Sequence, residues 1–100
     1  MENVKYEGKL LAFKHRESGE NIWGIVNVKN VWDDLYVIGP GFSFKHDIRN
    51  DKVDFYFENE YQVPIGSLFG EVSKEEACTL ILAYYNKAKD KIEFRDYGKV

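Results

Sequence analysis

The chain has 100 residues, of which 44% are hydrophobic and 31% are charged, and its formal net charge at pH 7 is −3. This length supports one domain, residues 1–100, and leaves no room for a second hydrophobic core. An acidic balance without a cluster of Lys and Arg argues against a nucleic-acid-binding protein, which needs basic side chains to meet phosphates. The single cysteine excludes an internal disulfide. Met1 leads into charged residues instead of a signal-peptide core, and no apolar run could span a bilayer, so we expect a cytoplasmic protein.

The first third of the chain has the alternation of a β-hairpin. Apolar and polar residues alternate along residues 4–15 and again along residues 22–32, which predicts two long strands. The segment from Glu17 to Asn21 between them has turn composition, and Gly19 can adopt a positive φ.

The middle of the chain predicts a second hairpin. Residues 35–38 form a short apolar strand that should end at Gly39-Pro40-Gly41, because proline cannot donate to a β-ladder. Residues 42–46 and 53–58 then alternate on either side of a polar loop, residues 47–52. The apolar face of this hairpin contains Phe42, Phe44, Val53, Phe55 and Phe57. The polar face contains Ser43, Lys45, Asp54, Tyr56 and Glu58.

The last third contains the one predicted helix, residues 73–90. Residues 61–65 precede it as a weak strand that Pro64 limits to an edge, followed by a loop over residues 66–70. Ser73 and Glu76 have the spacing of a capping box, which marks the start of the helix. Residues 92–95 follow as a short closing strand or as a tail. At 3.6 residues per turn, one side of the helix collects Ala77, Leu80, Ile81, Tyr84, Tyr85 and Ala88, with Cys78 and Leu82 at its margin.

These elements predict an α+β fold, in which the C-terminal helix packs on one face of a curled antiparallel sheet. The sheet should contain about five or six strands, arranged as two hairpins in a meander. The apolar arc of the helix is wider than one sheet face requires. Either the sheet curls partly around the helix or a second protomer covers the rest, and a monomer is slightly favoured.

The sequence offers little support for catalysis or for a bound metal. Cys78 lies in the first turns of the helix, a favourable place for a nucleophilic thiolate, yet its margin position beside Leu82 favours a buried structural cysteine. His15 and His46 fall near hairpin ends, where surface roles are more common, and no Cys/His cluster has metal-ligand spacing. Gly39-Pro40-Gly41 lacks the Lys-Ser/Thr of a phosphate loop. We therefore expect no enzyme activity, no cofactor and no metal.

The remaining candidate is an acidic surface on the second hairpin. Residues 51–76 carry seven acidic residues against Lys52 and Lys74. A charged sheet edge that prevents aggregation is the simpler explanation, although lysine is the usual choice there. The candidate partner-binding residues are Asp51, Asp54, Tyr56, Glu58 and Glu60.

Carboxylates flanking a tyrosine are typical of surfaces that dock on a basic protein patch. In composition, although not in any motif, the chain resembles the small acidic proteins that bacteria or phages make against toxins or defence enzymes. That likeness implies an immunity or inhibitor protein whose partner is a protein with a basic patch, and not nucleic acid or a membrane. The alternatives are a small ligand-binding module or enzyme that uses the concave face of the sheet, with His15, His46 or Cys78, and a phage structural or assembly protein.

Overall fold

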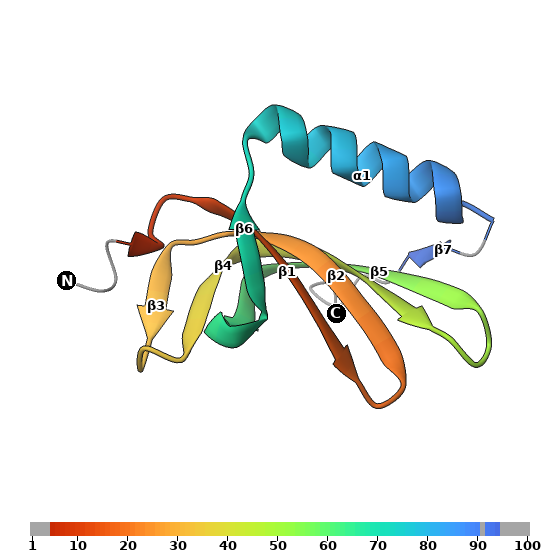
Figure 1. Cartoon of the computed structure of the whole chain (residues 1–100), viewed down its shortest axis with the longest axis horizontal. Coiled ribbons are helices and arrows are strands. Elements are labelled where there is room, and N and C mark those ends of the chain that lie inside the picture. The colour runs from red at the N-terminus through yellow and green to blue at the C-terminus, as the bar shows by residue number, and fades with distance from the viewer. Residues whose placement is uncertain (1–4, 91, 95–100) are drawn as a thin grey trace.

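The computed structural model describes residues 5–90 and 92–94, which form one curled sheet with a single helix lying across it (Figure 1). The strands run in the order β6-β1-β2-β4-β5-β7, with β3 paired to β4, and every pair is antiparallel except β5–β7. The predicted α+β class and curled sheet are therefore confirmed. The elements are β1 (Leu10–Glu17), β2 (Glu20–Asn27), β3 (Asn30–Trp32), β4 (Tyr36–Asp47), β5 (Lys52–Pro64), the 3-10 helix η2 (Ile65–Ser67), β6 (Leu68–Glu71), α1 (Lys74–Ala88) and β7 (Ile92–Phe94).

The first hairpin is confirmed, with shorter strands than the sequence predicts. Ser18 and Gly19, at φ 50° and 82°, form the tight turn between Glu17 and Glu20. Residues 5–8 are not part of β1, because the chain turns at Gly8, whose φ is +80°. β2 and β3 are likewise separate strands. Between them, the Gly8 N–H donates to the Val28 carbonyl and the Val28 N–H donates to the Lys9 carbonyl, both at 2.9 Å, while the Lys29 N–H donates to the Ile38 carbonyl of β4 at 2.8 Å.

The Gly39-Pro40-Gly41 segment does not end a strand, contrary to the prediction. It lies inside the continuous strand β4, opposite a bulge in β5 where the register shifts. Gly39 pairs with Tyr61 and Gly41 pairs with Glu58, so Pro40 faces two residues of β5 and its missing N–H interrupts no regular pair. A Cβ on Gly39 would collide with the carbonyl oxygen of Asn27, the last residue of β2. Glycine at this position therefore allows β4 to approach the end of β2 closely.

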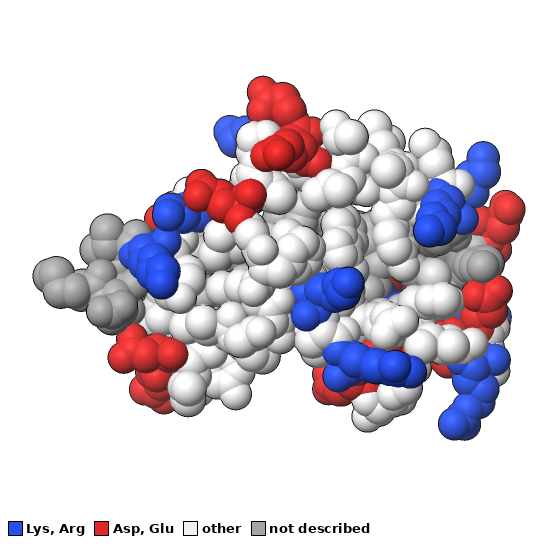
Figure 2. Space-filling model, in the orientation of Figure 1, with Lys and Arg blue, Asp and Glu red and all other residues white. Residues whose placement is uncertain are grey.

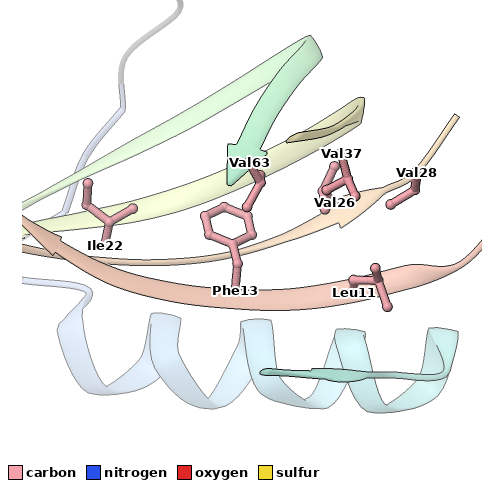
Figure 3. Close-up of a cluster of buried hydrophobic side chains, with 7 residues drawn as sticks. All are labelled: Leu11, Phe13, Ile22, Val26, Val28, Val37 and Val63. Carbon is pink, nitrogen blue, oxygen red and sulfur yellow. The ribbon is translucent and has the colours of Figure 1, made fainter. Parts of the chain in front are cut away.

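The curl of the sheet encloses the largest hydrophobic cluster, on the side away from α1 (Figure 3). β2 and β4 separate β1 from β5 in the sheet, yet the rings of Phe13 and Tyr61 lie 5.5 Å apart. This contact requires β5 to fold back over the face of β1. The cluster consists of Leu11, Phe13, Ile22, Val26, Val28, Val37 and Val63.

The helix begins where the sequence predicts. The Glu76 N–H donates to Ser73 Oγ at 3.0 Å and the Ser73 N–H donates to Glu76 Oε1 at 2.8 Å, which completes the capping box. On the convex face of the sheet, Tyr84 packs against Phe44 and stacks on Trp23, with ring centroids 4.5 and 5.4 Å apart.

The buried side of α1 is narrower than the predicted apolar arc. Ala77 is buried and Ile81 and Tyr84 are half-buried, whereas Leu80 and Tyr85 remain 38% and 39% exposed. The sheet curls away from the helix and around the cluster of Figure 3, so it does not cover the rest of the arc. Within residues 5–90 and 92–94, no helix combines the length and the apolar character needed to cross a membrane.

Candidate protein-binding surface

Three of the five candidate residues lie on the inside of the curl. Asp54 and Tyr56 on β5 pair directly with Lys45 and Ser43 on β4, and Glu58 pairs with Gly41. Alternation along a strand then places Asp54, Tyr56 and Glu58 on one face. This is also the face of Ile22, which pairs with Lys45 and belongs to the enclosed cluster. The predicted polar face of the hairpin is therefore the concave face of the sheet.

A lysine sits among these acidic residues. Lys45 Nζ lies 3.9 Å from Glu20 Oε1 and 5.1 Å from the centroid of the Tyr56 ring. The side chains of Lys45 and Glu20 are both only 29% exposed, which weakens the screening of their attraction by water and salt. The acidic surface is thus mixed in charge at its centre.

A pocket of about 330 Å³ opens on this face, lined by Lys45, Tyr56, Glu58 and Tyr61. Tyr61 reaches it because of the bulge in β5, which reverses the alternation beyond Glu58. The Tyr61 hydroxyl donates to the buried Ser43 Oγ at 2.6 Å and so fixes the ring. Burial raises the pKa of Tyr61 above its ordinary value of 10.0, and the Glu58 charge adds to that increase, whereas the bond to Ser43 opposes it.

The two remaining candidates, Asp51 and Glu60, lie in the turn and in the bulge of the hairpin. Asp51 is in the β4–β5 turn, where its Oδ1 lies 2.9 Å from His46 Nε2. Asp47 organises the same turn by accepting bonds from the backbone N–H groups of Arg49 and Asn50 and from the Asn50 side chain. The Asn50 bonds, with a smaller contribution from Arg49, lower the pKa of Asp47. Glu60 is exposed in the bulge.

The candidate catalytic residues are spread over the molecule. Cys78 is exposed on α1 and is not a buried structural residue, which corrects the expectation from its margin position. His15 lies on β1 beside Glu17, at 3.8 Å, and His46 pairs with Asp51 at the far end of β4. Within the described part of the chain, no three His, Cys, Asp or Glu side chains are grouped to hold a metal ion.

No protein-family profile, curated protein or solved structure matches this chain. The concave pocket combines the Glu58 carboxylate, the Lys45 ammonium group and two tyrosine side chains. A carboxylate beside two tyrosine rings suits a guanidinium or ammonium group, because the charge pairs with Glu58 and the planar group can stack on an aromatic face.

Sequence reasoning found Tyr56 and Glu58 but missed Lys45 and Tyr61 as pocket residues. Lys45 stood on the predicted polar face, so its position was available from alternation. Tyr61 was not, since simple alternation puts it on the opposite face from Glu58.

Proposed function

We propose that this protein is a non-catalytic binding protein that uses the acidic surface, Asp51, Asp54, Tyr56, Glu58 and Glu60, to bind a basic patch on a protein partner. The partner class that fits best is a toxin or defence enzyme that acts on nucleic acid, because such an enzyme has a basic cleft for phosphates. The protein then acts as an immunity or inhibitor protein.

The observation that carries this proposal is the pocket on the concave face. Glu58 lines it together with Tyr56 and Tyr61, so the rings can receive a basic side chain that the carboxylate neutralises. Glu60 is exposed nearby in the bulge and adds negative charge. Lys45, held over Tyr56 and near Glu20, limits how deeply a cation can enter and so favours an extended basic surface over a single ion.

The test uses the double charge reversal Glu58→Lys/Glu60→Lys. The probes are catalytically inactive forms of the proteins encoded next to the gene for this chain. We expect association with one of them to slow by about tenfold in the variant, and wild-type association to slow between about 50 and 300 mM salt. The matched control is Glu7→Lys/Asp90→Lys, which makes the same change in net charge at exposed positions outside the acidic surface. Equal association rates for the two double variants would overturn the assignment of the surface.

A second candidate function is the binding of a small zwitterion. The same pocket presents a cation and an anion, Lys45 and Glu58, between two aromatic rings, which matches an aromatic amino acid. Titration with phenylalanine, followed by amide chemical shifts, would favour this function if the shifts localise to residues 43–45 and 56–61 and saturate at about millimolar concentration.

A further inference from the structure

One flank of α1 carries a stripe with opposite charges at its two ends. Glu76, Leu80, Ala83 and Lys87 follow one another at spacings of four, three and four residues, which places them on one line along a helix. All four are exposed, although α1 packs on the sheet. Figure 2 shows this arrangement on the molecular surface, with acidic side chains over the start of α1, uncharged side chains along its middle and basic side chains at its end.

The Leu80 side chain lines two shallow hollows on this flank. One hollow, of about 310 Å³, is lined by Val72, Glu75, Glu76, Thr79 and Leu80. The other, of about 250 Å³, is lined by Trp23, Leu80, Ala83, Tyr84 and Lys87. The surface therefore has a partly exposed leucine and, beside it, a shallow apolar recess.

This stripe is complementary to itself when two helices run antiparallel. If Leu80 of one copy lies opposite Ala83 of the other, the two-fold axis also places Glu76 opposite Lys87, and every contact occurs twice. Each Leu80 then enters the hollow lined by Leu80, Ala83 and Lys87 of the other copy, and the small Ala83 allows close approach. Glu76 uses Oε1 in the capping box, so its second carboxylate oxygen can accept from the lysine.

We propose that the protein forms a two-fold symmetric homodimer through this stripe of α1. The dimer is independent of the proposed function, because α1 lies on the convex side of the sheet and the pocket lined by Tyr56 and Glu58 opens on the concave side. A helix of 15 residues is only about 22 Å long, so one helix pair buries less area than a standard permanent interface. Small interfaces are typical of weak, transient association, so we expect a micromolar dissociation constant and both concave faces to stay open.

The first test is sedimentation velocity from about 1 to 500 μM, a range that brackets a micromolar dissociation constant. We expect the mass of the wild type to rise from 11.7 kDa towards twice that value. Leu80→Glu should remain monomeric throughout, because it places a carboxylate in the apolar recess beside Ala83 of the other copy. The matched control, Leu82→Glu, changes a residue that is 60% exposed and two positions away, on another side of the helix, and should dimerise as the wild type does. A wild type that stays at 11.7 kDa, or a Leu80→Glu variant that dimerises normally, would overturn the proposal.

The second test exploits the reciprocal charge pairs. Lys87→Glu alone makes two Glu–Glu contacts and Glu76→Lys alone makes two Lys–Lys contacts, so each should lose at least about tenfold in self-association. Mixed together, the two variants restore two opposite-charge pairs and should form heterodimers. Glu76→Gln, which retains a side chain suited to the capping box, separates the charge effect from any loss of helix stability. If the mixture associates no better than either variant alone, the antiparallel pairing is wrong.

Discussion

Tyr61 connects the bulge, the enclosed cluster and the candidate pocket through one side chain. Its ring packs against Phe13, while its hydroxyl donates to Ser43, which is fully buried. If a buried hydroxyl loses its hydrogen-bond partner, water cannot replace that partner. The loss therefore destabilises the fold more than the same loss at an exposed hydroxyl would. The bond therefore fixes the ring that forms one wall of the pocket.

Replacing Tyr61 with phenylalanine should lower the free energy of unfolding by about 1–2 kcal/mol. The ring and its packing on Phe13 are retained, so the loss comes from the Ser43 hydroxyl. Urea denaturation measures the loss of unfolding free energy. The control is Tyr85→Phe, at an exposed position of α1, for which we expect a loss of no more than about 0.5 kcal/mol. Adding Ser43→Ala should recover part of the loss, since neither polar group is then left unpaired. A Tyr61→Phe effect no larger than that of the control would show that the hydroxyl contributes nothing.

Asp47 should make the fold sensitive to acid. The folded state depresses the pKa of Asp47 below its ordinary value of 3.8. The contribution of this carboxylate to stability is therefore fully present above pH 3.8 and is lost as the pH falls through the folded-state pKa. We expect Asp47→Ala to be less stable than the wild type at pH 6 and the difference to shrink below about pH 3.5. Denaturation midpoints of the two proteins from pH 2 to 7 measure this difference in stability. A difference that does not vary with pH would contradict the prediction.

At the scale of the strand, β4 depends on Gly39. A Cβ there would meet the backbone oxygen of Asn27, which cannot move aside as a flexible side chain could. We expect Gly39→Ala to lower the free energy of unfolding by more than about 3 kcal/mol or to prevent folding. The matched control is Gly70→Ala in β6, where a Cβ has no heavy atom within 4 Å and the φ is not positive. That variant should fold normally, with a change of at most about 1 kcal/mol. Similar midpoints and amide spectra for the two variants would show that the crossing of β4 past Asn27 tolerates a side chain.

Local signals in the sequence were sufficient for some elements and not for others. The start of α1 was predictable, because the capping box involves only Ser73 and Glu76. The continuity of β4 was not predictable from its own residues, since Pro40 is accommodated only by the extra residue in the partner strand. The two glycines around Pro40 are where the neighbouring backbone approaches closely, a role of strand glycines that the sequence alone does not distinguish from a turn.

The candidate surface shows the same limit. Alternation correctly separated Asp54, Tyr56 and Glu58 from the phenylalanines that face α1, with Phe57 more exposed than expected. It could not show that their face becomes the concave side, because the direction of curl depends on contacts between distant strands, such as Phe13 with Tyr61. Whether the surface binds a protein stays a prediction.

The whole molecule has apolar clusters on both faces of the sheet, and on the convex face the strands supply most of the buried side chains. The concave cluster contains seven buried residues contributed by several strands, whereas Ala77 is the only buried residue among the described side chains of α1. Cooperative units with fewer buried contacts open at lower free energy. The helix should therefore separate from the sheet while the strands remain folded.

Native-state hydrogen exchange on Val63→Ala tests this order of opening. Val63 is fully buried in the concave cluster, so the substitution should lower the free energy of global unfolding by about 2 kcal/mol. Amides of β1 and β2 exchange through global unfolding and should lose that amount of protection. Amides of α1 should keep their protection. They exchange when the helix alone opens, and the concave cluster that contains Val63 is intact both before and after that opening. Ser73→Ala is the complementary variant. It weakens the helix in the native state and should lower protection in α1 and in the strands alike, by about 1 kcal/mol. If Val63→Ala lowers protection in α1 as much as in β2, the helix opens only with the whole fold, and the helix and the sheet form one cooperative unit.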